Sequence, residues 1–204
     1  MGEIEANGCH VIQVCHQGAV IVASINRNSW LSHLCPDEYY ERVEAIAPER
    51  LWERGIRGLI LDLDNTLVKY HEHHVNSELL RWFDRVKSQG ITCCILSNNH
   101  RRRRINRIAD KLGVQFVARA GKPRRRPFLT AMHMLNTDRH STAVIGDQVF
   151  TDVLGGKRSG LYTVLIQPRS SRDFIGTRVM RCFETGIVRY LTTRGYVRLV
   201  TGHE

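Results

Sequence analysis

The sequence of 204 residues predicts an α/β protein with a doubly wound, Rossmann-like parallel sheet. Two observations support this fold class. Short apolar runs alternate with segments of helical character, and run after run ends in polar side chains. The most informative run is Gly58–Thr66, GLILDLDNT, in which large apolar residues give way to two aspartates. This pattern is typical of a central parallel strand whose carboxyl end lies at an open sheet edge.

Length and composition limit the class of protein. The length suits one domain with a proper core, and the apolar share of 42% is ordinary for a soluble globular protein. No apolar run approaches the ~20 residues of a membrane span. The stretch Ala19–Ile25 is short, and Glu3 and Glu5 precede it where a signal peptide would be basic, so we expect a cytoplasmic protein. The six cysteines show no C-x-x-C spacing, which favours core thiols over a disulfide or zinc framework.

Residues 1–29 have no clear period and are expected to form a flexible tail or an extension upstream of the natural start. A single domain is expected over residues 30–198. Helical patterns run from Pro36-Asp37 to Ala47 and from Pro48 to Gly55, directly before the Gly58 strand.

The remaining elements follow in alternation. Asn76 or Ser77 caps a helix that runs to Gln89, and Gly90 ends it. Further strands are predicted at Ile91–Leu96, Val114–Ala118, Thr142–Ile145 and Tyr162–Ile166. Further helices are predicted from Arg101 to Leu112, from Pro127 to Leu135, and from Arg172 to Thr193.

The strand ends share polar side chains that can take part in chemistry. They are Asp62 and Asp64, then Ser97 and Asn98, then Lys122, and last Asp147. Since the carboxyl ends of parallel strands lie on one edge, where ligands bind, these groups should meet. Three carboxylates favour Mg²⁺ over zinc, while a serine at a helix start and an ammonium suit a phosphate oxyanion. A carboxylate beside such a phosphate can act as the nucleophile and form an aspartyl-phosphate.

Four short motifs carry a family resemblance. The set DLDNT, SNN, Lys122-Pro123 and GDQ-x-x-TD resembles the motifs of the haloacid dehalogenase (HAD) superfamily of phosphatases. The resemblance is closer to the subfamily IIIA proteins called YqeG, whose relatives include phosphatidylglycerophosphate phosphatases of yeast mitochondria and of plastids. It covers roughly Leu31 to Arg198 and implies a HAD-like fold.

The resemblance implies a role for each matching acid. Asp62 would be the nucleophile. Asp64 would protonate the leaving oxygen and then activate the water that hydrolyses the aspartyl-phosphate. The Mg²⁺ ion would be held by Asp62, the backbone carbonyl of Asp64, and Asp147.

The resemblance also implies phosphate-binding and supporting residues. Ser97 and Lys122 would bind the transferring phosphate, with Asn98 assisting through its amide. Asp152 would bind metal-bound water or orient Lys122, and Thr66 would support the site. Simpler explanations exist for three of them, since Ser97 suits a helix cap, Lys122 a solvated loop, and Asp152 a loop support. The motifs in register favour function for Ser97 and Lys122, and leave Asp152 evenly balanced.

The spacing of the motifs leaves no room for a cap domain. About thirty residues separate the first two motifs, and a loop, a helix and a strand use them up. Between Ser97 and Lys122 only a helix and a strand fit. A site without a lid suits a phosphate carried on something large, such as a lipid surface, a nucleic acid or a protein.

Basic residues are expected around this site. The net charge is +10, and Arg101–Arg104 and Arg124–Arg126 follow two of the motifs, so a cationic rim for docking is favoured over a merely solvated helix face. The last predicted helix, Arg172–Thr193, has an apolar stripe and arginines around it; packing on the sheet is favoured over lying on an anionic membrane. The loop histidines His71, His73 and His74 resemble a metal cluster, but a solvated loop is favoured.

Two hypotheses for the function follow. The leading one is a Mg²⁺-dependent phosphomonoesterase that converts phosphatidylglycerophosphate to phosphatidylglycerol, in the cytoplasm with peripheral contact to the membrane. The alternative is an RNA- or ribosome-associated basic protein with a HAD fold, or a phosphatase of another large phosphorylated substrate. Against RNA, no aromatic side chains are interleaved with the arginine runs. The oligomeric state is not indicated by the sequence.

Overall fold

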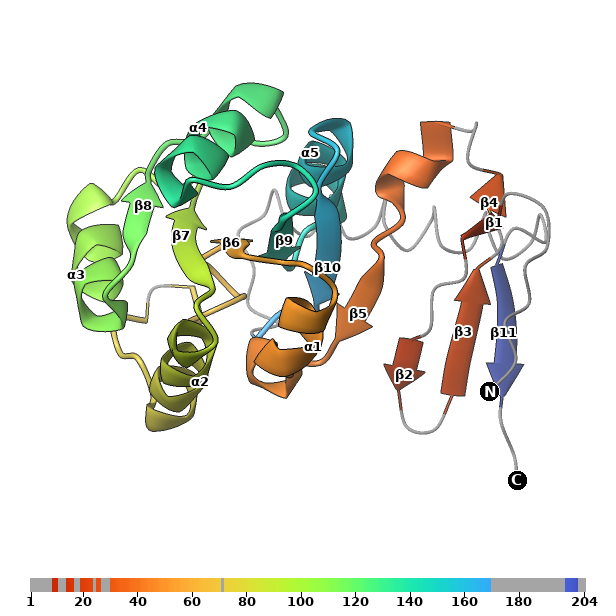
Figure 1. Cartoon of the computed structure of the whole chain (residues 1–204), viewed down its shortest axis with the longest axis horizontal. Helices are drawn as coiled ribbons and strands as arrows, with labels where there is room; N and C mark the ends of the chain where they lie inside the picture. The colour runs from red at the N-terminus through yellow and green to blue at the C-terminus, as the bar shows by residue number, and fades with distance from the viewer. Residues whose placement is uncertain are drawn as a thin grey trace.

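A computed structural model describes residues 9–10, 14–16, 19–23, 25–26, 30–70, 72–169 and 197–201. Its main feature is a six-stranded sheet with the strand order β5-β10-β9-β6-β7-β8 (Figure 1). Every neighbouring pair in this sheet is parallel. The strands are β5 Glu38–Tyr40, β6 Gly58–Leu61, β7 Thr92–Leu96, β8 Gln115–Val117, β9 Thr142–Gly146 and β10 Tyr162–Ile166.

Helices cover both faces of the sheet, as a doubly wound fold requires. They are α1 Pro48–Glu53, α2 Ser77–Ser88, α3 Arg102–Leu112, α4 Arg125–Leu135 and α5 Leu154–Arg158. In Figure 1, α1 and α2 lie on one side of the sheet, and α4 and α5 lie on the other. The predicted fold class is therefore confirmed.

The central strand β6 shows how the sequence produces these two layers. All four of its residues are buried. Leu59 and Leu61 pack in the core shared with α1, α2 and α3, whereas Ile60 packs in the core shared with α4. Since successive side chains of a strand point to opposite faces, a continuous apolar run is needed in a strand that is covered twice.

One predicted helix was wrong. The segment from Asp37 to Ala47 contains the short strand β5 and a 3-10 helix at Val43–Ala45. The backbone N–H of Asp37 donates to the carbonyl of Thr163 (2.8 Å), and β5 then pairs with β10. Pairing at the sheet edge satisfies the backbone of β5, so the Pro-Asp signal for a helix start was misleading.

Most other boundaries match the prediction closely. The Asn76 side chain caps α2 by accepting from the backbone N–H of Leu79 (2.7 Å), and Gly113 ends α3 with a φ of 60°. Helix α4 begins two residues before Pro127. Between β9 and α5 the chain forms a π-helical turn, Val149–Val153, which the sequence did not indicate. The helix predicted over residues 172–193 lies outside the described residues.

No additional domain is inserted at the two places where a cap could begin. Between β6 and β7 the described chain forms a loop and α2, and between β7 and β8 it forms α3. The expected absence of a cap domain is confirmed for these described connections.

Strands from both ends of the chain form smaller sheets. Strand β1 (Cys9–His10) pairs with β4 (Ile25–Asn26), and β3 (Ala19–Ala23) lies between β2 (Val14–His16) and β11 (Val197–Thr201), all antiparallel. The three-stranded sheet lies beyond β5 in Figure 1. The status of residues 1–29 as an extension stays a prediction. Within the described part of the chain, no helix has the length and apolar character needed to cross a membrane.

Candidate active site

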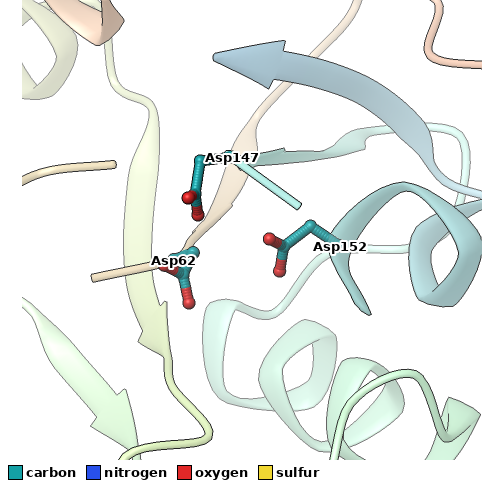
Figure 2. Close-up of side chains that lie close together, drawn as sticks. All are labelled: Asp62, Asp147 and Asp152. Carbon is teal, nitrogen blue, oxygen red and sulfur yellow. The ribbon is translucent and has the colours of Figure 1, made fainter. Parts of the chain in front are cut away.

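Three carboxylates meet at the carboxyl edge of the sheet. Asp62 directly follows β6 and Asp147 directly follows β9, and these two strands are neighbours. Asp152 comes from the π-helical turn after β9. Figure 2 shows the three side chains turned toward one another, and each offers an oxygen within 4.8 Å of the others. All three are buried, so their mutual repulsion is only weakly screened.

A glycine lets Asp152 approach the sheet. A Cβ atom at position 146 would lie 2.3 Å from Cγ of Asp152, which is far inside van der Waals contact. The Oδ2 atom of Asp152 accepts from the backbone N–H of Gln148 (3.2 Å), and the turn is thereby closed on itself. Only glycine at position 146 leaves Asp152 in this place.

Lys122 brings a positive charge into the carboxylate cluster from the loop after β8. Its Nζ donates to Oδ1 of Asp62 (2.6 Å) and to Oδ1 of Asp152 (2.6 Å). Burial alone would lower the pKa of this ammonium, but Asp152 and Asp62 raise it above its usual value. The lysine therefore stays charged, and since an ammonium has three N–H groups, one remains available for a further acceptor.

The two carboxylates at the strand ends each have an unsatisfied oxygen. Oδ2 of Asp62 and Oδ2 of Asp147 are buried without a hydrogen-bond partner. Burial raises the pKa of Asp62 to about 7 despite Lys122, and burial together with Asp62 and Asp152 raises the pKa of Asp147 to about 9. Buried, unpaired carboxylate oxygens that face one another are the donors that a hard divalent cation prefers. The residues present thus fit a metal ion.

The supporting residues divide between the metal ligands and the lysine. The hydroxyl of Thr66 donates to Oδ1 of Asp147 (3.3 Å) and so helps to fix the orientation of that carboxylate. Asp152 has both oxygens engaged, one by Lys122 and one by Gln148, so its free ligand capacity is smaller than that of Asp62 or Asp147. Two roles were expected for Asp152, namely binding metal-bound water and orienting Lys122. Its hydrogen bonds are those expected of a residue that orients Lys122.

Residues after β7 complete the site. Ser97 is buried at the end of β7, and its hydroxyl accepts from the backbone N–H of Asn99 (3.1 Å). The amide of Asn98 holds the backbone of Lys122 in both directions, donating to its carbonyl (3.2 Å) and accepting from its N–H (2.8 Å). Asn98 thus positions the lysine loop, while its contact with a phosphate stays a prediction.

Asp64 lies apart from the carboxylate cluster, and a buried arginine holds it. Its Oδ1 accepts from Nη1 of Arg104 (2.6 Å), and its Oδ2 accepts from Nδ2 of Asn99 (2.8 Å). The prediction that all of Arg101–Arg104 would form an exposed rim was wrong for Arg104, which is 4% exposed. Arg101, Arg102 and Arg103 are exposed as expected, and so are the arginines at 124, 125 and 126.

The sequence contained a signal for the buried arginine. Arg104, Ile108 and Leu112 recur every four residues and are all buried, so they share the face of α3 that packs on the sheet. The arginine run concealed this periodicity. Another residue that was missed is Arg169, whose Nε donates to the carbonyl of Thr66 (2.7 Å) and whose guanidinium pairs with the buried Glu44. Arg169 supports the loop after β6 from beyond β10.

The loop histidines contribute no metal site in the described part of the chain. His73 and His74 are exposed, and His71 lies outside the described residues. Among described side chains, the group of at least three that could hold a metal ion is the aspartate cluster.

Comparison with known proteins gives three matches in sequence. Residues 70–160 match a hydrolase family described as haloacid dehalogenase-like hydrolase. The chain is 39% identical to the probable phosphatase YqeG of Bacillus subtilis over 163 residues, which are 80% of this chain and 94% of that protein. It is 27% identical over 144 residues to phosphatidylglycerophosphate phosphatase 1, chloroplastic/mitochondrial, of Arabidopsis thaliana, covering 65% of this chain and 41% of that protein.

Solved structures resemble the chain more distantly. The cobalt-bound form of a deoxy-D-mannose-octulosonate 8-phosphate phosphatase from Haemophilus influenzae is 17% identical, with a TM-score of 0.47. The match covers 55% of this chain and 69% of that one.

Proposed function

The chain belongs to the YqeG family of haloacid dehalogenase-like hydrolases and is a phosphatase, and we propose that it cleaves phosphomonoesters through an aspartyl-phosphate on Asp62. The observation that carries this mechanism is the environment of Asp62. One oxygen is held by the Lys122 ammonium, and the other is buried and unpaired at the sheet edge. A carboxylate held this way is oriented for attack and not consumed by other donors.

In the first step, a carboxylate oxygen of Asp62 attacks phosphorus as the bond from phosphorus to the leaving oxygen breaks. Asp64 gives its proton to that oxygen, so the alcohol leaves neutral. The remaining N–H of Lys122 and the hydroxyl of Ser97 bind the phosphate oxygens and offset their charge. The phosphoryl group is now covalently attached to Asp62.

In the second step, water attacks phosphorus and the bond to the Asp62 oxygen breaks. Asp64, which lost its proton in the first step, takes one from this water. Inorganic phosphate leaves, Asp62 is again a free carboxylate, and Asp64 is again protonated. One acid serves both steps because each restores the form of Asp64 that the other requires.

The proposed cofactor is Mg²⁺, held by the carboxylates of Asp62 and Asp147 and the backbone carbonyl of Asp64. When bound, it would neutralise the carboxylate repulsion and draw charge from the phosphate. The pKa values of Asp62 and Asp147, raised by burial to about 7 and about 9, indicate how strongly the metal-free site disfavours two ionised carboxylates. An ion with hard oxygen ligands removes this penalty.

The proposed substrate is phosphatidylglycerophosphate, and the product is phosphatidylglycerol. Three observations support a phosphate presented at a lipid surface. The described connections contain no cap that could enclose a small metabolite, and exposed arginines follow both Ser97 and Lys122 in the chain. The Arabidopsis relative carries the name of that lipid phosphatase, although this chain spans less than half of it.

The arginine rim is defined here as the exposed residues Arg101, Arg102, Arg103, Arg124, Arg125 and Arg126. Within residues 32–70 and 72–169, no carboxylate lies within ion-pair distance of the side chains of Arg124, Arg125 or Arg126. Charges without acidic partners are available for an anionic surface, where each basic residue contributes about 1 kcal/mol of attraction. We propose peripheral contact with an anionic membrane through this rim.

The test is phosphate release by the purified full-length chain. With Mg²⁺, phosphatidylglycerophosphate in mixed micelles should be hydrolysed faster than a soluble glycerol phosphate at equal concentration, and a chelator should stop the reaction. Rapid hydrolysis of soluble esters with none of the lipid would refute the lipid substrate. Release from phosphorylated RNA ends in preference to lipid would instead support the nucleic-acid alternative, in which the rim binds a polyanion in a salt-dependent manner.

A further inference from the structure

The side chain of Arg104 connects α3 to the loop after β6 through three separate contacts. Its Nη1 donates to Oδ1 of Asp64 (2.6 Å), its Nε to the carbonyl of Glu72 (2.9 Å), and its Nη2 to the carbonyl of Lys69 (3.2 Å). The side chain is 3% exposed, so these contacts form away from water. A planar guanidinium with donors in fixed directions can make all three at once, whereas a lysine cannot.

Asp64 is held from both sides by one segment of the chain. Asn99 donates Nδ2 to Oδ2 of Asp64 (2.8 Å), while Arg104 takes Oδ1. The backbone N–H of Arg101 donates to Oδ1 of the same Asn99 side chain (2.9 Å), which fixes the orientation of its amide. The carboxylate of Asp64 therefore has little freedom to rotate, although each oxygen retains a second lone pair.

We propose that Arg104, assisted by Asn99, is a positioning residue that fixes the Asp64 carboxyl group for proton transfer at the leaving oxygen. This inference rests on the proposed function, because it assumes that Asp64 handles the proton. Holding a catalytic group in one geometry removes an entropic cost from the reaction step itself. No cap domain is inserted in the described loop after β6. The hydrogen bonds from Arg104 of α3 and from Asn99 therefore supply the rigidity that Asp64 requires.

A purely structural role for Arg104 makes a different prediction. A buried ion pair that only stabilises the fold would reduce the turnover of every ester by the same factor when it is broken. A positioning role acts on proton donation, which matters for an alkoxide leaving group and hardly matters for p-nitrophenolate. The ratio of turnover numbers for two esters thus separates the two roles.

The experiment compares Arg104→Met with Arg107→Gln in the full-length protein. Arg107 is exposed on the same helix and makes no hydrogen bond or ion pair with Asp64. Replacing it with glutamine removes one positive charge, as Arg104→Met does, and therefore controls for the change in net charge. For Arg104→Met, kcat for glycerol 3-phosphate should fall about 10²-fold while kcat for p-nitrophenyl phosphate falls less than about tenfold, with KM nearly unchanged. Arg107→Gln should leave both values at the wild-type level.

Asn99→Ala keeps the inference testable if Arg104→Met does not fold. It removes one of the two bonds to Asp64 and should show the same selective loss on the alkyl ester, to a smaller degree. Equal losses on both esters in a folded variant, or no loss in either variant, would overturn the positioning role. Wild-type protein that hydrolyses neither of these esters, nor phosphatidylglycerophosphate in mixed micelles, would instead refute the proposed function, and the inference with it.

Discussion

The Nζ atom of Lys122 lies 2.6 Å from Oδ1 of Asp62, although the two residues are sixty positions apart in the sequence. The same ammonium lies 2.6 Å from Oδ1 of Asp152. One positive charge therefore faces three buried carboxylates when Asp147 is included. With all three carboxylates ionised, the cluster is negative despite Lys122, which explains why the ionised form calls for a divalent cation.

Replacing the nucleophile should abolish turnover. Asp62→Asn keeps the size of the side chain but cannot form the acyl-phosphate, so kcat should fall by at least about 10³-fold. Wild-type protein quenched in acid during turnover should carry phosphate on Asp62, detectable by mass spectrometry, and the variant should carry none. Residual turnover of the variant above about one tenth of wild type would exclude covalent catalysis by Asp62.

Mg²⁺ should stabilise the protein more as the pH rises. In the metal-free fold, burial raises the pKa of Asp62 to about 7 and of Asp147 to about 9, above the value of 3.8 in the unfolded chain. Raised folded pKa values stabilise the fold fully below the unfolded pKa, and this stability is lost as pH rises through the folded values. Metal binding uses the ionised carboxylates, so the increase in Tm with Mg²⁺ should be larger near pH 8.5 than near pH 5.5.

Asp147→Asn isolates the metal response from other effects of pH. It removes one repelling carboxylate, so the metal-free Tm near pH 8.5 should rise and the Mg²⁺-dependent increase should disappear. Asp84→Asn, at an exposed position of α2, serves as the matched control and should retain the increase. A Mg²⁺ response in Asp147→Asn equal to that of wild type would show that the ion binds elsewhere.

Reversing a charge in the arginine rim should affect lipid-bound substrate only. Arg125→Glu should lower the rate on vesicles containing anionic lipid about tenfold at low salt, because it removes one attractive charge and adds a repulsive one. Hydrolysis of p-nitrophenyl phosphate should be unchanged. Arg139→Glu, an exposed position in the turn before β9, at the other end of the strands, is the control. Equal rates for both variants on vesicles would remove the rim from substrate docking.

Adding one methyl group at Gly146 should displace the side chain of Asp152. Gly146→Ala would place a Cβ 2.3 Å from Cγ of Asp152, so the carboxylate must move away from Lys122. Overpacking of this kind destabilises proteins by about 1–3 kcal/mol, and denaturant unfolding should measure a loss in that range. Activity should fall together with stability. An alanine variant with wild-type stability and activity would mean that Asp152 has an equally good alternative position.

The buried parallel strands could be predicted from the sequence because each is a continuous apolar run, a pattern that is visible in a few neighbouring residues. In β6 and β9, runs of apolar residues stop at Asp62 and Asp147, and the sheet topology then places those ends together. The short edge strand β5 could not be predicted this way. Its sequence, Glu-Tyr-Tyr, has no apolar run, and Glu38 is partnered by Arg50 of α1 and by Arg54, the residue that follows α1. Its strand conformation depends on pairing with a segment far along the chain.

The contacts that orient the site were also beyond local reasoning. A run of four arginines suggests solvent. The four-residue spacing of Arg104, Ile108 and Leu112 indicates a buried face of α3 but not the partner of Arg104, and the tertiary structure shows that this partner is Asp64. Similarly, phosphate binding by Asn98 stays a prediction, and the structure adds that its amide hydrogen bonds are to the backbone of Lys122. Sequence motifs identified which groups gather, and the tertiary structure is needed to tell a ligand from the residue that supports it.

The pairing of β5 with β10 has a consequence for how the chain is made. The backbone N–H of Asp37 bonds to Thr163, which is 126 residues later in the sequence. During synthesis on the ribosome, the first-made segment of the sheet must wait until the last strand of that sheet has emerged. Forming such a distant contact is slow, because a long loop has to close before any pairing energy is gained. Until then, β5 is an unpaired strand in a nascent protein, and chaperone capture of this N-terminal segment would protect it.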